Sequence, residues 1–117
     1  MENLNPIYHW YLLPEAETKK ILSLSNQQLT RIFFKGRNIC VASLDGEFFG
    51  INDHCPHAGT SLASAMTCNK KGVITCPNHH YKFYIKTGLS ADGNNYCVPH
   101  YVFSKQEQGL YIGSKTA

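Results

Sequence analysis

Residues 52–88 read NDHCPHAGTSLASAMTCNKKGVITCPNHHYKFYIKTG, and two short motifs stand out in this stretch. The first is Cys55-Pro56-His57 and the second is Cys76-Pro77-Asn78-His79, with eighteen residues between them. Each motif offers one thiolate and one imidazole, and a proline follows each cysteine. Because proline restricts φ and removes a hydrogen-bond donor, it suits a stiff loop that presents side chains at a set distance. The stretch therefore predicts a metal site built from two loops.

The order of these motifs, C-x-H followed by C-x-x-H, resembles the signature of the Rieske family. The resemblance covers most of the chain, from Trp10 onward. It implies a 2Fe–2S cluster in which Cys55 and Cys76 hold one iron while His57 and His79 hold the other. With neutral imidazoles, two ferric ions, two sulfides and two thiolates sum to zero charge. Such a cluster takes up an electron more readily than one with four thiolates.

Positions outside the ligands also resemble the family pattern. Gly59 and Leu62 follow the first motif as in C-P-H-x-G-x-x-L, and we expect Leu62 to anchor its loop on the core. Phe83 and the pair Thr87-Gly88 follow the second motif as in F-x₃-T-G. A proline and a tyrosine close over the cluster from a third side in the family, and Pro99 and Tyr101 resemble them.

Three departures from that pattern favour the soluble, dioxygenase-type branch. His80 replaces the glycine that usually follows the second ligand histidine, so it is left out of the ligand set and expected at the rim. Membrane-bound respiratory relatives carry an extra cysteine after each motif, and neither motif is followed by one here. Those high-potential relatives also have Ser and Tyr where this chain has Tyr81 and Phe83.

The rest of the chain consists of short strand-like runs separated by turn signals. Aromatic residues before Pro14 predict a first strand, Glu15–Lys20 a polar connection with one helical turn, and Ile21–Leu24 a brief strand. Asp45-Gly46 is a strong hairpin signal. Further strands are expected at residues 29–35, 39–44, 47–52, 73–75, 81–85, 97–103 and 110–113. The predicted class is all-β: a Rieske-type base, an antiparallel sandwich or small barrel, with a cluster-binding subdomain of two loops.

The length of 117 residues predicts a single domain over residues 1–117. In this interpretation the cluster-binding subdomain, about residues 53–88, is inserted between base segments 1–52 and 89–117. No run of residues approaches a membrane span, and the N-terminus lacks the basic and apolar regions of a secretory signal. The net charge of +3 is mild, and no basic stripe with interleaved aromatics indicates nucleic acid.

The chain has five cysteines, and we expect no disulfide framework in what we interpret as a cytoplasmic protein. Cys40 and Cys97 lie in apolar, strand-like surroundings and are predicted to act as small core residues. Cys68 lies in a polar stretch and is predicted to be an exposed thiol.

The resemblance implies an electron carrier without catalytic residues of its own. It would take one electron from a flavin reductase and pass it to a terminal oxygenase or a similar acceptor. One alternative is the small Rieske-like subunit of an assimilatory nitrite reductase. The donor, the acceptor and the oligomeric state stay open.

Two other classes of function fit the sequence less well. A structural zinc site is an alternative because Cys₂His₂ is a common zinc set, although zinc fingers usually order their ligands as C-x-x-C and H-x₃₋₅-H. The N-terminal part of a Rieske oxygenase would need a second domain with a two-His, one-carboxylate iron site. The roughly 30 residues that follow the cluster segment leave no room for it.

Overall fold

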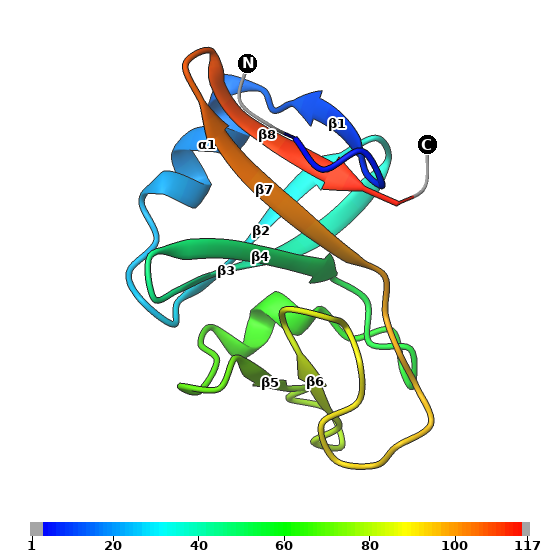
Figure 1. The fold of residues 1–117 in the computed structure, drawn as a ribbon. Coiled ribbons are helices and arrows are strands. Elements are labelled where there is room, and N and C mark those ends of the chain that lie inside the picture. Colours follow the sequence, from blue (N-terminus) through cyan, green and yellow to red (C-terminus); the bar gives the residue numbers. More distant parts are fainter. Residues whose placement is uncertain (1–3, 116–117) are drawn as a thin grey trace.

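The structure is a computed structural model that describes residues 4–115. Six antiparallel strands form one curled sheet in the order β1-β8-β7-β4-β3-β2, and β5 pairs with β6 in a separate small sheet (Figure 1). The strands are β1 His9–Leu12, β2 Leu29–Phe34, β3 Arg37–Leu44, β4 Glu47–Asn52, β5 Val73–Thr75, β6 Lys82–Tyr84, β7 His100–Gln106 and β8 Gly109–Ser114. The predicted all-β class is confirmed, and the base is a single curled sheet that forms a half-barrel.

The two hairpins at the sheet edge follow from their turn residues. β2 and β3 are joined by Lys35-Gly36, and β3 and β4 by Asp45-Gly46. All four residues have positive φ, between 49° and 85°. A two-residue hairpin of this kind matches the twist of the strands, and glycine adopts it without steric cost. The hairpin predicted at Asp45-Gly46 is therefore confirmed.

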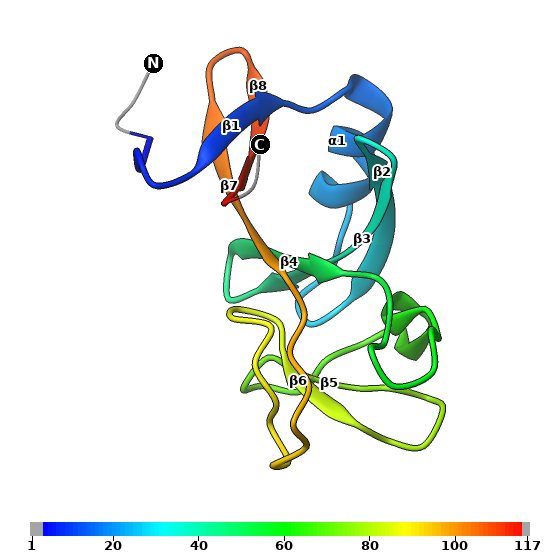
Figure 2. The same ribbon diagram turned by 90° about the vertical axis from the view of Figure 1, so that its right-hand side faces the viewer.

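The helix α1 (Glu15–Leu22) corrects the prediction of one helical turn followed by a strand at Ile21–Leu24. A short apolar run does not by itself distinguish a strand from a buried helix turn. Ile21 is fully buried in the base, and two lysines in the last turn complement the helix dipole. The helix lies between β1 and β2, the two edge strands (Figure 2), and Glu17 accepts a hydrogen bond from the N–H of Phe33 on β2 at 3.0 Å.

Strand β3 buries both of its faces, and this places the small sheet. Ile39 and Val41 point into the base core, whereas Cys40, Ala42 and Leu44 belong to a second core. The second core joins the base to the segment that carries the Cys-His motifs. Its buried members are Leu29, Cys40, Ala42, Leu44, Ile51, Cys55, Leu62, Cys68, Ile74, Cys76, Phe83, Ile85 and Val98.

Two of the three cysteines outside the motifs differ from expectation. Cys40 is fully buried, as predicted, but Cys68 is buried and Cys97 is exposed. Cys68 is drawn into the second core because its N–H donates to the carbonyl of Gln27 and the neighbouring residue Thr67 bridges to Gln28. All five cysteines are free thiols. Within residues 4–115 no helix is long and apolar enough to span a membrane.

Candidate metal centre

The first motif loop leaves β4 and closes on itself through two backbone hydrogen bonds. The N–H of Cys55 donates to the carbonyl of Thr60 at 2.9 Å, and the N–H of Gly59 donates to the carbonyl of Cys55 at 2.7 Å. Gly59 has a φ of +77°. The 3₁₀ helix η1 (Leu62–Ala65) follows and places Leu62 fully buried in the second core, as predicted.

The second motif loop follows β5 and repeats the same pair of hydrogen bonds. The N–H of Cys76 donates to the carbonyl of Tyr81 at 2.7 Å, and the N–H of His80 donates to the carbonyl of Cys76 at 3.1 Å. His79 and His80 have φ values of 69° and 63°. Each loop therefore presents a buried cysteine at its base and a histidine further out.

The two predicted histidines meet across the gap between the loops. The Nδ1 atoms of His57 and His79 are 3.3 Å apart, and their ring centroids are 4.8 Å apart. Two imidazole nitrogens that each lie about 2.1 Å from one tetrahedral metal ion are separated by about 3.4 Å. The observed separation fits two nitrogens that share one metal ion.

The two predicted cysteines also meet, and they are more deeply buried than the histidines. Cys55 and Cys76 are both fully buried in the second core, and their side chains are within hydrogen-bond reach of each other. Burial raises the pKa of the Cys76 thiol, whereas the N–H of Asn78 and the hydroxyl of Thr60 lower that pKa by donating to its sulfur. These donors stabilise a thiolate, the form that binds metal.

The four side chains are thus paired like with like, sulfur with sulfur and nitrogen with nitrogen. Among residues 4–115 no three His, Cys, Asp or Glu side chains form a group around one ion. The Rieske cluster needs two cysteines on one iron and two histidines on the other. The donor set and its pairing fit that cluster, and a single zinc ion bound by all four residues would need them at one point.

A third segment covers the histidine side of the site. The ring of Tyr81 lies 4.3 Å from that of His57, measured between centroids, and Tyr96 stacks on Tyr81 at 5.7 Å. Sequence reasoning missed Tyr96. The signal available was an aromatic residue in a polar loop shortly before Pro99, but nothing local showed which way its ring would lie.

The resemblance assigned this covering role to Pro99 and Tyr101, and for Tyr101 that assignment is wrong. Tyr101 is the second residue of β7, pairs with Gly50 of β4 and is buried in the base core, apart from the cysteines. Its hydroxyl donates to the side-chain carbonyl of Asn52 at 2.8 Å. His80 is exposed, as expected for a rim residue.

Comparison with protein families matches residues 9–102 to the Rieske [2Fe-2S] domain. The chain is 30% identical over 84 residues to the terminal oxygenase component of carbazole 1,9a-dioxygenase from Metapseudomonas resinovorans. It is 31% identical over 61 residues to the ferredoxin subunit of 3-phenylpropionate/cinnamic acid dioxygenase from Escherichia coli strain K12. The first alignment covers 72% of this chain and 21% of the relative, and the second covers 52% of each.

Solved structures show the same fold. The ferredoxin of carbazole 1,9a-dioxygenase from Nocardioides aromaticivorans IC177 aligns with a TM-score of 0.69 and 19% identity, over 80% of this chain and 90% of that one. A chain in a complex of reduced oxygenase and oxidized ferredoxin of carbazole 1,9a-dioxygenase aligns with a TM-score of 0.71 and 20% identity. That alignment covers 88% of this chain and 91% of the other. Of the curated relatives, the chain spans about a fifth of the oxygenase component and about half of the ferredoxin subunit.

Proposed function

The chain belongs to the Rieske [2Fe-2S] domain family, and we propose that Cys55, His57, Cys76 and His79 hold its cluster. The observation that carries this assignment is the 3.3 Å approach of the Nδ1 atoms of His57 and His79 in front of two paired, buried cysteines. When bound, a Rieske cluster takes up and releases one electron at a potential between about −150 and +300 mV.

The residues around the ligands have distinct parts in this function. Thr60 and Asn78 donate to the sulfur of Cys76, and such donors stabilise negative charge on the ligand. Leu62 and Phe83 are fully buried beside the cysteines and keep water from the sulfur side. His79 is exposed and His57 is half-buried, so the histidine side is where a partner protein makes its contact.

We propose that the chain is a ferredoxin, a carrier that takes one electron from a flavin reductase and delivers it to a terminal oxygenase. The supporting observations are the match to the Rieske family and the similarity to components named after two dioxygenases. That similarity favours a dioxygenase system over a nitrite reductase. The carrier has no catalytic residue in this proposal.

We also propose a cytoplasmic location and a single domain over residues 1–117, with the cluster subdomain at about residues 53–88. Five free cysteines support a reducing compartment, because thiols there are kept from pairing. The second core supports a single domain, because it joins β3 of the base to both motif loops. Residues 1–3 and 116–117 lie outside the described part of the chain.

The proposal is tested first on the purified protein alone. It should contain iron and acid-labile sulfide in equal amounts and, once reduced, give the electron paramagnetic resonance spectrum of a Rieske cluster. Zinc without sulfide, in protein made with ample iron, contradicts the cluster assignment.

The second test is turnover. NADH oxidation by a flavin reductase should be coupled to product formation by a dioxygenase only when this protein is added. An apoprotein control separates electron transfer from a structural effect on the oxygenase. A loaded protein that a reductase reduces, but that supports no turnover with any dioxygenase encoded near it, contradicts the assignment to a dioxygenase system.

A further inference from the structure

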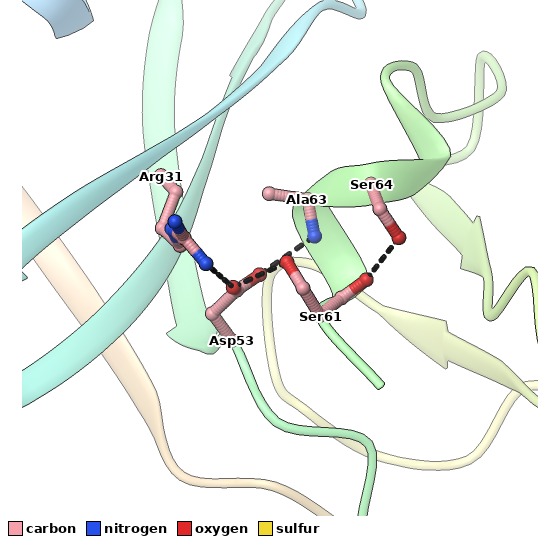
Figure 3. Close-up of polar contacts among 5 residues, drawn as sticks. All are labelled: Arg31, Asp53, Ser61, Ala63 and Ser64. Atoms are coloured by element: carbon pink, nitrogen blue, oxygen red, sulfur yellow. Dashed lines mark hydrogen bonds and ion pairs between the residues drawn. The ribbon is translucent and has the colours of Figure 1, made fainter. Parts of the chain in front are cut away.

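A buried carboxylate spans the loop that carries the first cysteine. The side chain of Asp53, two residues before Cys55, is only 1% exposed. Its Oδ2 accepts a hydrogen bond from the hydroxyl of Ser61 at 2.5 Å, and its Oδ1 accepts one from the N–H of Ala63 at 2.6 Å (Figure 3). Both donors lie at the start of η1, so Asp53 ties the beginning of the loop to its end.

A cation from the edge of the sheet faces this carboxylate. Nη1 of Arg31, on β2, lies 3.9 Å from Oδ2 of Asp53, and the arginine side chain is 56% exposed (Figure 3). The backbone N–H of Asp53 donates to the carbonyl of Asn38 at 3.0 Å, which holds the loop against the β2–β3 hairpin. A buried anion is thus partly neutralised by a cation that solvent screens.

The charge of Asp53 acts inside the second core. Burial is the first reason that the pKa of Cys40 is raised, and the Asp53 carboxylate is the second. Cys40 belongs to the same core as Cys55 and Cys76. Because charges interact more strongly in the interior than in water, the charge of Asp53, two residues from Cys55, should also act on a metal centre held by those two cysteines.

We propose that Asp53 is a positioning residue for the metal centre and that the Asp53–Arg31 pair also sets the centre's reduction potential. This inference rests on the ligands given under the proposed function. A nearby negative charge disfavours the addition of an electron, and a nearby positive charge favours it. Asp53 therefore lowers the potential, and Arg31 offsets part of that effect.

The charge effect is tested by voltammetry of the loaded protein at one pH and ionic strength. Asp53→Asn keeps the shape and removes the charge, so its potential should rise, with the equilibrium constant for reduction raised at least threefold. Arg31→Gln should lower the same constant. A tenfold change corresponds to about 59 mV for one electron. The matched controls are Glu15→Gln and Lys19→Gln on α1, an ion pair at 3.3 Å whose side chains are 83% and 76% exposed. Both controls should leave the potential unchanged.

The positioning effect is tested by the rate at which a ferrous chelator removes iron from the reduced protein. Ser61→Ala removes one hydrogen bond to Asp53 and no charge, so iron loss should be several times faster while the potential stays at the wild-type value. Ser61→Thr keeps the hydroxyl and should restore the wild-type rate. Unchanged iron loss in Ser61→Ala overturns the positioning part of the proposal.

The sign of the shifts decides the charge part. If Asp53→Asn loses the cluster, Arg31→Gln still tests the sign, because its side chain is more than half exposed and its removal leaves no cavity. The proposal is overturned if the reduction potential of Asp53→Asn or of Arg31→Gln equals that of the α1 controls. It is also overturned if the reduction potential of Arg31→Gln rises above that of the wild type. Failure of the proposed function gives a different result. In that case the reduction potentials of the variants would still shift as described, but the protein would support no product formation by a dioxygenase.

Discussion

Gly59 and His80 occupy equivalent positions in the two motif loops. Each lies four residues after a cysteine, Cys55 or Cys76, and donates its N–H to the carbonyl of that cysteine. Each also has a positive φ, +77° for Gly59 and 63° for His80. The two loops thus contain the same type of turn. Only the first loop has glycine, the residue that favours this backbone conformation, at the position of positive φ.

The strain at His80 leads to the first prediction. A residue with a Cβ is destabilised by roughly 1–2 kcal/mol in the left-handed region. Replacing it by glycine removes this strain, but glycine loses more backbone entropy on folding, which offsets part of the stabilisation. His80→Gly should therefore raise the free energy of unfolding by about 0.5–1 kcal/mol. Urea denaturation of the loaded protein measures this. The reciprocal variant Gly59→Ala should lose about 1 kcal/mol, and a destabilised His80→Gly would contradict the interpretation.

The second prediction concerns the ligand register. Cys55→Ser, His57→Ala, Cys76→Ser and His79→Ala should each abolish or grossly destabilise the cluster, because each removes one of four metal bonds. His80→Ala should keep it, since His80 is exposed and contributes its backbone rather than its ring. Iron and sulfide content, with the visible absorption spectrum, reads out both classes. A cluster that needs His80 but not His79 would show that the register is wrong.

The third prediction concerns the reduction potential, which should lie toward the low end of the Rieske span of about −150 to +300 mV. Hydroxyl groups that donate to cluster sulfurs stabilise the reduced form more than the oxidised form. Phe83 is fully buried in the same core as both cysteines and has no hydroxyl, and the ring of Tyr81 is engaged with His57. A wild-type potential well above zero would contradict the argument.

The double variant Tyr81→Ser, Phe83→Tyr tests the reason behind that potential. If the new donors favour the reduced form by about 1.4 kcal/mol, the potential should rise by about 60 mV. Voltammetry of the wild type and the variant at one pH measures the shift. The single variant Tyr96→Phe is the control, because it keeps the aromatic stack on Tyr81 and adds no donor. An intact double variant with a lower potential would refute the hydroxyl argument.

The fourth prediction concerns Gly88, where the third covering segment meets the second loop. A Cβ at Gly88 would lie 1.9 Å from the carbonyl oxygen of Val98, and φ there is +75°. Gly88→Ala should therefore cost about 3 kcal/mol or more, because backbone must move. Gly93→Ala is the matched control on the same segment, with a φ of +80° and nothing within 4 Å of the added Cβ.

For these glycine variants the measurement is chemical denaturation, with the fluorescence of the aromatic stack as a second probe. Gly93→Ala should lose only about 1 kcal/mol, the cost of the left-handed backbone. Equal losses in the two variants would show that the contact with Val98 is not what demands glycine at position 88.

The fifth prediction concerns pH and His100, at the start of β7. Burial lowers the pKa of His100 first, and Lys115 lowers it further. The unfolded chain, with an ordinary histidine pKa of about 6.5, therefore takes up a proton before the folded chain does. Neutral His100 contributes its full share of stability above the unfolded-state pKa of about 6.5. This contribution is lost as the pH falls from there through the lower pKa of His100 in the folded protein.

His100→Gln should accordingly flatten the fall in stability below about pH 6.5, compared with the wild type. The hydroxyl of Tyr8, 3.2 Å from Nε2 of His100, retains a polar partner in this variant. His9→Gln, at an exposed position on β1, is the control and should leave the profile unchanged. A profile that His100→Gln leaves equally steep would rule out this source of acid sensitivity.

The amino-acid sequence alone was enough to identify the two Cys-His motifs and to predict the hairpin at Asp45-Gly46 and the burial of Leu62. These features depend on residue types and short spacings, which local chemistry governs. The membership of the family also follows from those spacings.

Features that depend on contacts between distant residues were decided by the tertiary structure alone. Ile21 was misassigned because the base core, and not its immediate neighbours, holds it in a helix. For a similar reason Cys68 is buried where exposure was expected, and Cys97 is exposed where burial was expected. The stacking of Tyr96 on Tyr81 and the ion pair between Arg31 and Asp53, which are 22 residues apart in the chain, were also decided by the tertiary structure. No local pattern encodes which side chains the curled sheet brings together.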